Sequence, residues 1–179
     1  MKSLTTFIFL VAAIFVNGQT QTAKDTSFNW ETIDRYSYSV QYPTSWIIDT
    51  SKQLGADLFI FSQKDSDTDK FRENVNVIIQ DLKGLNITLD KYIEISEGQI
   101  KTMLTNASII ESKRINQGNK EYHELTFTGQ QGIFNLMTKQ YYLLVNEKAF
   151  VITLTTEQNH YDKYKENGEA ILKSFKLKE

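Results

Sequence analysis

The sequence has no cysteine, a single proline and 8 glycines among its 179 residues. The absence of cysteine excludes disulfides, thiolate catalysis, cysteine-bound metal and a lipidated N-terminal cysteine. The scarcity of proline and glycine argues against low-complexity sequence and long flexible linkers. The hydrophobic share of 40% is enough for one domain of roughly 150 residues with its own core.

An excess of basic charge is also missing, because 22 acidic residues balance 20 basic ones and the formal net charge is −2. Proteins that bind nucleic acid usually carry a basic face, so we predict no nucleic-acid partner. The sequence contains neither a Gly-x-Gly-x-x-Gly nor a Walker pattern, and it lacks a Gly-x-Ser-x-Gly elbow. A catalytic triad need not be local in sequence, but no motif here predicts an enzyme or a cofactor.

Residues 1–18 have the features of a secretory signal peptide. Lys2 supplies the positive start, residues 7–16 form the apolar centre, and Val16-Asn17-Gly18 offers small or slim residues for cleavage. The apolar run of roughly ten residues is shorter than the ~20 that a membrane-spanning helix needs. We therefore expect no stable membrane anchor after cleavage.

The remainder of the chain divides into a short polar segment and one domain. Residues 19–29 are polar and are predicted to form a disordered lead-in. Residues 30–179 show no internal repeat and no second domain, so we predict a single unit. The processed protein is expected to be exported, either periplasmic or secreted.

The segment Met137–Thr156 is predicted to be the centre of the fold. It contains two runs rich in Tyr, Val, Ile, Phe and Thr, which favour pleated strands, and Asn146 between them tolerates the positive φ of a tight reversal. Apolar side chains alternate onto both faces of the second run, with Phe150, Ile152 and Leu154 on one face and Ala149 and Val151 on the other. Both faces must be covered, which predicts a sheet enclosed between two layers.

Apolar alternation predicts further strands, and helical periodicity predicts two helices. The helices are expected at residues 88–104, with Thr88 as the N-cap, and at about residues 159–175. A turn is expected at residues 129–132. Hairpin-length connections favour a mostly antiparallel sheet with helices on its faces, which is an α+β protein. The additional strands are expected at residues 36–42, 46–48, 58–61, 75–79, 108–115 and 121–128.

Two segments, taken together, resemble the PsbP/Mog1-like family. The first is Tyr38-Ser-Val-Gln-Tyr42-Pro43-Thr-Ser-Trp46, in which an aromatic strand leads into Tyr-Pro-x-x-Trp. The second is the run Ala149–Thr156, followed by a helix that ends in Ile171-Leu-Lys-Ser-Phe175. Between them, the helix beginning Thr88-Leu-Asp lies where that family has its first long helix. The resemblance covers Trp30–Lys178, and the order and spacing of the motifs carry it.

The resemblance implies an α/β/α sandwich, in which a central, mostly antiparallel sheet of about six or seven strands has helices on both faces. Members of this family serve as extrinsic subunits of photosystem II, as partners of the small GTPase Ran, and as exported bacterial proteins. The export signal argues against a Ran partner, and the exported bacterial relatives match the layout best. Some members bind metal through histidine and carboxylates, but no such set maps onto this sequence.

Aromatic residues offer one candidate binding site. Tyr36, Tyr38 and Tyr42 fall on one side of the predicted opening strand, and Trp46 follows them. Aromatic side chains can line a groove for a peptide or an apolar ligand. Packing in the core is the commoner role for such residues, and both interpretations stay open.

The two histidines offer a second candidate. His123 is predicted on a strand face with apolar neighbours and lies next to Glu121 and Glu124, so a metal or acid–base role is conceivable. A hydrogen-bonded residue in the core or at its rim is the commoner arrangement. His160 is expected at the start of the last helix, in a surface or capping role. No His-x-x-x-His spacing is present, and no metal site is predicted.

The acidic segment Asp65-Ser-Asp67-Thr-Asp69 resembles the start of a calcium loop. An EF-hand loop requires glycine at its sixth position and glutamate at its twelfth, where this sequence has Lys70 and Asn76. We therefore predict a solvated acidic loop.

The sequence favours an exported, non-enzymatic domain that binds a protein or a ligand as an accessory factor of the cell envelope. The expected partner is an envelope or extracellular protein. One alternative is a metal-dependent site or enzyme built from dispersed residues, with His123 and nearby carboxylates as the candidates. Another alternative is a carrier of a small apolar ligand.

Overall fold

The computed structural model of the protein describes residues 29–117 and 120–178. The predicted signal peptide at residues 1–18, and the lead-in up to residue 28, lie outside the described residues. Within these ranges, no helix is both long enough and apolar enough to cross a membrane.

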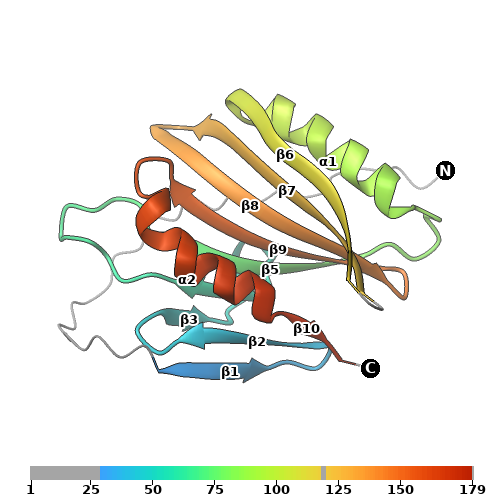
Figure 1. The fold of residues 1–179 in the computed structure, drawn as a ribbon, viewed down its shortest axis with the longest axis horizontal. Coiled ribbons are helices and arrows are strands. Elements are labelled where there is room, and N and C mark those ends of the chain that lie inside the picture. The colour runs from blue at the N-terminus through green and yellow to red at the C-terminus, as the bar shows by residue number, and fades with distance from the viewer. Residues whose placement is uncertain (1–28, 118–119, 179) are drawn as a thin grey trace.

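The central layer is a seven-stranded sheet (Figure 1). Every neighbouring pair of its strands is antiparallel. The predicted antiparallel sheet of six or seven strands is therefore confirmed. In spatial order, the strands are β3 (Ile47–Asp49), β4 (Leu58–Phe61), β5 (Asn74–Asp81), β9 (Lys148–Glu157), β8 (Phe134–Val145), β7 (Lys120–Gln131) and β6 (Thr105–Gln117).

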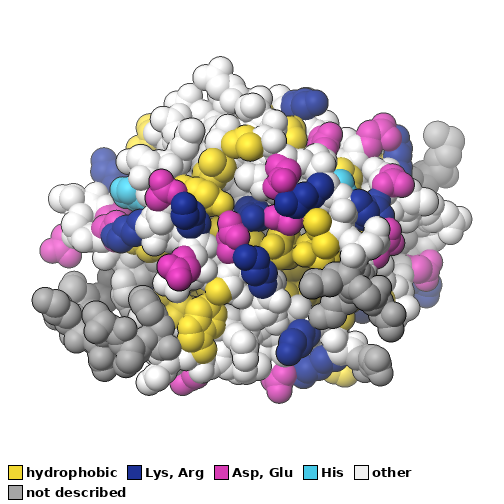
Figure 2. Space-filling model, viewed as in Figure 1, with side chains coloured by type: hydrophobic (Ala, Val, Ile, Leu, Met, Phe, Trp, Pro, Cys, Tyr) yellow, Lys and Arg dark blue, Asp and Glu magenta, His cyan; other side chains and the backbone are white. Residues whose placement is uncertain are grey.

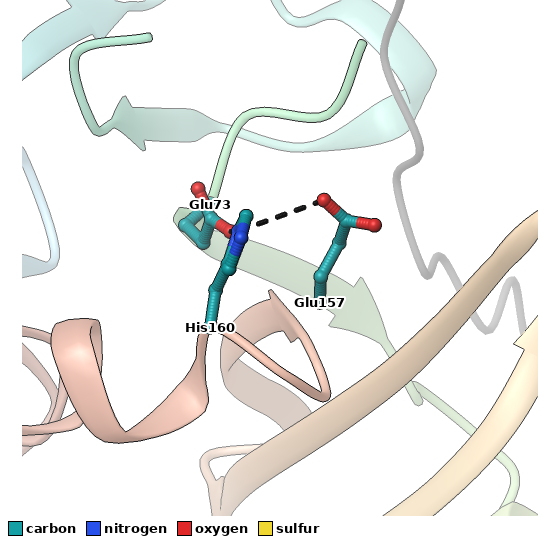
Figure 3. Close-up of side chains that lie close together, drawn as sticks. All are labelled: Glu73, Glu157 and His160. Carbon is teal, nitrogen blue, oxygen red and sulfur yellow. Dashed lines mark hydrogen bonds and ion pairs between the residues drawn. The ribbon is translucent and has the colours of Figure 1, made fainter. Parts of the chain in front are cut away.

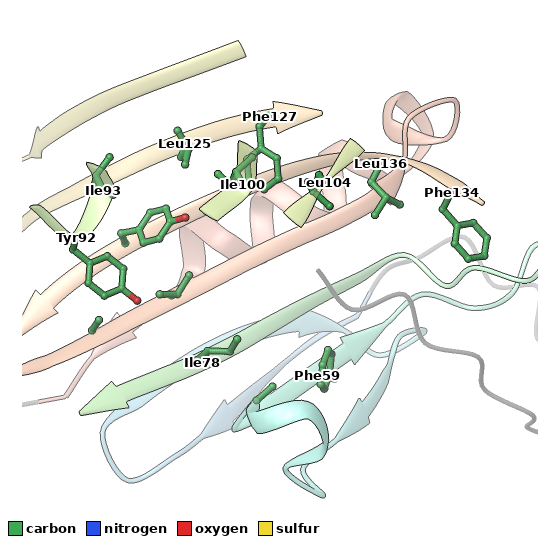
Figure 4. Close-up of a cluster of buried hydrophobic side chains, with 14 of the residues drawn as sticks. Phe59, Ile78, Tyr92, Ile93, Ile100, Leu104, Leu125, Phe127, Phe134 and Leu136 are labelled. Carbon is green, nitrogen blue, oxygen red and sulfur yellow. The ribbon is translucent and has the colours of Figure 1, made fainter. Parts of the chain in front are cut away.

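Helices α1 (Leu89–Met103) and α2 (Tyr161–Ser174) cover opposite faces of this sheet (Figure 1). The side chains of α1 point toward β7 and β8 in Figure 4, where Ile100 lies near Leu125 and Phe127. The side chains of α2 belong to a separate buried cluster on the other face, with Ile171 and Leu172 beside Ile152 and Leu154. The predicted α/β/α sandwich is confirmed.

The β8–β9 hairpin has the alternation that the sequence predicts. Asn146 and Glu147 form its turn with φ values of 51° and 57°. Phe150, Ile152 and Leu154 pack on the α2 side, whereas Ala149 and Val151 pack on the α1 side. Strand β9 lies between β5 and β8 in the sheet, and both of its faces are buried because one cluster packs on each of them.

A second, three-stranded sheet was not anticipated from the sequence. It has the order β1 (Trp30–Asp34), β2 (Tyr38–Pro43) and β10 (Lys176–Leu177). Strand β1 is almost entirely exposed and shows no apolar alternation, and β10 has only two residues, so neither gives a detectable signal. This sheet lies beside α2 and adds Tyr38 and Val40 to the core on that face.

The predicted elements are found with their ends shifted by up to three residues, as for the strand predicted at residues 108–115, which is β6 at Thr105–Gln117. The side chain of Thr88 accepts a hydrogen bond from the N–H of Lys91 at 3.2 Å and caps α1. The turn predicted at residues 129–132 starts too early, because Gly129 still pairs with Leu136 in the β7–β8 ladder. The chain reverses at Gly132, whose φ is 59°. A short 3-10 turn, η1 (Gln53–Gly55), separates β3 from β4.

Charges of both signs are interspersed on the molecular face that carries α2 (Figure 2). Among the described residues, no large basic patch lies on this face. Ion pairs such as Lys165–Asp162 at 2.6 Å and Lys173–Glu169 at 3.2 Å run along the helix surface. This charge pattern gives no support for nucleic-acid binding.

Candidate functional site

A pocket of about 440 Å³ lies at the end of the sheet where β9 leads into α2. Most of its lining is polar and acidic. It is formed by the loop before β5, the β7–β8 turn and the β9–α2 connection, through Asp65, Ser66, Thr68, Asp69, Lys70, Ile133, Phe134, Glu157 and His160.

Glu73, Glu157 and His160 meet beside this pocket (Figure 3). The Nδ1 atom of His160 lies 3.1 Å from Glu73 Oε1 and 3.6 Å from Glu157 Oε2. One ligand atom from each residue can be chosen so that all three lie within 4.8 Å of one another. Among the residues that the structure describes, these three form the one group of histidine and carboxylate side chains close enough to hold a metal ion.

Strand pairing explains why these distant residues meet. Strands β5 and β9 are antiparallel neighbours, and Asn74 pairs with Thr155, so Glu73 lies beside the end of β9. The chain then turns directly into α2 and places His160 over Glu73. His160 occupies the N-cap position of α2, but its side chain makes no capping hydrogen bond. His160 therefore lies at the start of the last helix, as expected, and its side chain is 31% exposed, but the imidazole contacts two carboxylates instead of capping the helix.

The Glu73 carboxylate is buried, and no lysine or arginine is paired with it among the described ion pairs. Its side chain is 1% exposed, and His160 is its only described ion-pair partner. The neighbouring Arg72 turns away, donating to the carbonyl oxygen of Ser62 at 3.1 and 2.8 Å and lying over the Phe61 ring. Burial raises the pKa of Glu73 above its ordinary value, against the opposing effects of its own backbone and of His160.

Glu73→Gln is expected to stabilise the metal-free protein at pH 7 by about 1 kcal/mol, because a buried charge is removed while the shape is kept. A raised pKa means that the folded state binds more protons than the unfolded state, so stability falls as pH rises from about 4.3 through the folded pKa. The polar and titratable groups near the Glu73 carboxylate, which also influence its titration, are His160, Glu157, Asp69 and Ser62. Urea unfolding at pH 4 and pH 7 measures the effect. A variant that is less stable at pH 7 by a similar amount would contradict it.

The acidic segment at residues 65–69 is tied to α2 at its first position. Asp65 accepts hydrogen bonds from Tyr164 Oη at 2.5 Å and from Lys163. Burial opposes ionisation of Asp65, but these two hydrogen bonds outweigh it and lower its pKa. Asp69 accepts hydrogen bonds from the N–H groups of Asp65 and Phe71 at 3.0 and 3.1 Å. The predicted solvated loop is thus an ordered rim of the pocket.

The four aromatic candidates do not form one exposed surface. Tyr36 is fully exposed ahead of β2, whereas Tyr38, Tyr42 and Trp46 are buried in the core beside α2. Tyr38 stacks on Phe175 with ring centroids 5.1 Å apart and donates a hydrogen bond to Asp57 at 2.9 Å. The structure thus gives the three buried residues a packing role. A binding role for these four residues stays a prediction.

His123 lies on the α1 side of β7, apart from the pocket. Its Nε2 is 2.9 Å from Ser112 Oγ, and Ser112 donates a hydrogen bond to Glu97 Oε1 at 2.7 Å. The buried Nδ1 has no described hydrogen-bond partner. Burial, followed by the charge of Arg114, lowers the pKa of His123. In a Ser-His-Asp triad the carboxylate contacts the imidazole, whereas here it contacts the serine.

The carboxylates next to His123 in sequence are committed to other partners. Glu121 pairs with Arg114 at 2.8 Å, and Glu124 pairs with Lys139 at 2.8 Å on the opposite face of the sheet. The described contacts therefore do not assemble the alternative metal or acid–base site of His123 with these carboxylates, and the hydrogen bond to Ser112 matches the commoner arrangement at the rim of the core.

Buried polar side chains from three adjacent strands form a grid on the α1 face of the sheet. The grid has two rows, and each row contains one residue from β5, one from β9 and one from β8 that are paired across the sheet. All six are at most 2% exposed, and the hydroxyls of Thr138 and Thr155 have no described hydrogen-bond partner. The rows are Asn74–Thr155–Thr138 and Asn76–Thr153–Gln140.

Thr138→Val and Thr155→Val are each expected to leave the free energy of unfolding unchanged or to raise it by up to about 1 kcal/mol, because each removes an unpaired buried hydroxyl. Thr153→Val is the matched control. Its hydroxyl accepts a hydrogen bond from Gln140 Nε2 at 2.9 Å, so its loss should cost about 1–3 kcal/mol. Chemical denaturation measures the free energy of unfolding of the three variants. Equal losses of stability at all three positions would contradict the conclusion that the hydroxyls of Thr138 and Thr155 are unpaired.

Comparisons with known proteins identify the fold. No family model matches this sequence, and no curated protein matches it. Three solved structures are similar to the chain over most of their own length. Cyanobacterial PsbP (CyanoP) from Synechocystis sp. PCC 6803 has a TM-score of 0.64 and 18% identity, and covers 90% of this chain and 98% of its own. LpqN, involved in cell envelope biogenesis of Mycobacterium tuberculosis, has a TM-score of 0.60 and 13% identity, with 85% and 92% covered.

The third structure is PA94, a protein of unknown function from Pseudomonas aeruginosa, with a TM-score of 0.57 and 11% identity, covering 81% of this chain and 94% of its own. The chain therefore has the PsbP-like fold, as the sequence resemblance implies. At these identities the likeness establishes the fold and not the activity.

Proposed function

We propose that the protein is an exported, non-enzymatic accessory domain of the cell envelope that binds another protein at the pocket-bearing end of its sheet. Support for export comes from the signal-like residues 1–18. Support for an envelope role comes from the fold that this protein shares with LpqN, a protein described as involved in cell envelope biogenesis.

The single observation that carries the docking proposal is the exposure of Ile133 at the pocket. This side chain is 69% exposed at the β7–β8 turn. Asp65, Asp69 and Glu157 line the same pocket. An exposed aliphatic residue beside polar groups matches the apolar centre and polar rim of protein interfaces. The acidic rim favours a partner segment with basic residues next to an apolar one.

Site-specific photo-crosslinking tests the docking surface. A photoreactive phenylalanine analogue is placed at Ile133 in the full chain and, as the control, at Ile110, which is 57% exposed on edge strand β6. Irradiation of the producing cells should give a discrete adduct from position 133 and none from position 110. Identical products at both positions, or none at position 133, would refute docking at this end.

Mass spectrometry of the protein purified from its own envelope or medium tests export. The expected mass is that of a chain cleaved near Gly18, found outside the cytoplasm. An uncleaved chain confined to the cytoplasm would contradict the export proposal.

The cluster of Glu73, Glu157 and His160 favours a second candidate, a metal-dependent site. This alternative transfers the metal role from His123 to residues that the structure brings together. It is compatible with docking, because two of its three residues line the same pocket.

A further inference from the structure

We propose that Glu73, Glu157 and His160 bind one divalent transition-metal ion, for which zinc is the best fit, with an open coordination position toward the pocket. The inference depends on neither export nor protein docking, and it is tested on the purified protein alone.

The spacing of the donor atoms suits zinc. Zinc binds histidine nitrogen and carboxylate oxygen at about 2.0–2.2 Å, so neighbouring ligands of a tetrahedral ion lie about 3.3 Å apart. The separations from His160 Nδ1 to the oxygens of Glu73 and Glu157 are 3.1 and 3.6 Å. One donor atom from each residue lies within 4.8 Å of the others, so the two carboxylates must close in by up to about 1.5 Å to reach tetrahedral spacing.

The donor chemistry also selects the class of metal. Calcium takes 6–8 oxygen ligands, and magnesium is usually bound through one or two carboxylates and several waters. One imidazole nitrogen with two carboxylates is instead a donor set for zinc and its transition-metal neighbours. Three protein ligands leave one position of a tetrahedral zinc ion free, as in zinc sites that act on a substrate or a ligand.

The burial of Glu73 is an independent reason for a cation here. Its side chain is 1% exposed and directed at His160 (Figure 3), and no lysine or arginine is paired with it among the described ion pairs. The nearest arginine in sequence, Arg72, is committed to the Ser62 carbonyl oxygen and the Phe61 ring. A bound dication would place a positive charge beside this buried carboxylate, and buried charges are stable when they are paired or coordinate a metal.

The position of the cluster gives the ion a route to solvent and to a ligand. Glu157 and His160 line the 440 Å³ pocket, whereas Glu73 is not among its lining residues. Ser62 Oγ donates a hydrogen bond to Glu73 Oε2 at 3.4 Å and helps to orient the carboxylate that would hold the ion. The open coordination position would then face the pocket, where a carboxylate or imidazole of a partner could complete the shell.

Zinc titration of the chelator-treated, purified protein tests the proposal. Isothermal calorimetry, together with elemental analysis after dialysis, should show one equivalent of zinc, and zinc should raise the melting temperature. Glu73→Gln and His160→Gln should each weaken binding at least about tenfold. His123→Gln is the matched control, because it removes the only other histidine and should leave binding unchanged.

Each result is decisive. Glu73→Gln is expected to fold stably without metal, so its loss of the zinc-induced rise in melting temperature would reflect the lost ligand. Zinc binding that survives both Glu73→Gln and His160→Gln, that disappears in His123→Gln, or that is absent in the unmutated protein would overturn the site. None of these results would alter the outcome of the crosslinking experiment at Ile133.

Discussion

Replacing Lys139 by methionine is expected to lower the free energy of unfolding by about 3 kcal/mol, because it removes the cation that lies closest to both the buried Glu124 and the part-buried Glu169. Lys139 Nζ lies 2.8 Å from Glu124 Oε1 and 3.1 Å from Glu169 Oε1. The lysine and Glu124 side chains are only 12% and 8% exposed. The network of ion pairs among Glu124, Lys139 and Glu169 joins β7 and β8 to α2. Burial alone would lower the pKa of Lys139, but its hydrogen bonds to the two glutamates raise it.

The loss should depend on pH in a defined direction. Burial opposes ionisation of Glu169, but its hydrogen bond from Lys139 outweighs burial and lowers its pKa. A lowered pKa contributes stability that is present above the unfolded value of about 4.3 and is lost as pH falls through the folded pKa. The difference between Lys139→Met and the unmutated protein should therefore be largest near pH 7 and shrink below about pH 4.

Lys173→Met is the matched control for this prediction. Lys173 contacts the same Glu169 at 3.2 Å, but its side chain is 64% exposed. A surface pair one helical turn apart contributes only about 0.3–0.5 kcal/mol. Urea unfolding at pH 7 and pH 4 compares the two variants. Equal losses, or a loss below about 1 kcal/mol for Lys139→Met, would show that the buried ion pair does not hold α2 to the sheet.

Gly168→Ala is expected to destabilise the protein by about 1–3 kcal/mol, although alanine is the better helix former. A Cβ atom at Gly168 would lie 2.5 and 2.7 Å from Leu154 Cδ1 and Cδ2. Leu154 is fully buried in the centre of β9, so it has little room to yield. The absence of a side chain at Gly168 lets α2 approach the sheet closely.

Gly98→Ala provides the contrast within the same fold. Gly98 lies inside α1, and an added Cβ would meet no atom within 4 Å. This substitution should raise stability by up to about 1 kcal/mol, the difference in helix propensity between the two residues. Thermal unfolding should therefore shift in opposite directions for the two variants. A gain at both positions would contradict the close packing of α2 on β9.

The sequence predicted the elements whose apolar pattern is set by their own burial. Val151, Ile152 and Leu154 alternate between two covered faces, and Thr88 caps α1, so periodicity and capping chemistry were sufficient for both elements. The small second sheet could not be predicted, because β1 is exposed and β10 joins β2 through only two residues. The close approach of Gly168 to Leu154 could not be predicted either, because it depends on how closely α2 packs on the sheet.

The candidate site was beyond sequence reasoning for a similar reason. Glu73 and His160 are 87 positions apart and meet only because β5 pairs with β9. His160 has no local motif that separates a metal ligand from a helix cap. The acidic residues at positions 65–69 were visible as a group, but their link to α2 requires Tyr164 and Lys163 from the far end of the chain.

Anomalous diffraction at the zinc edge, from crystals grown with one equivalent of zinc, is the most direct test of whether this fold assembles a functional centre. The prediction is one strong peak within about 2.2 Å of His160 Nδ1 and of a carboxylate oxygen from Glu73 and Glu157. A peak at His123 instead, or no ordered zinc beside His160, would contradict a metal site at the end of this sheet.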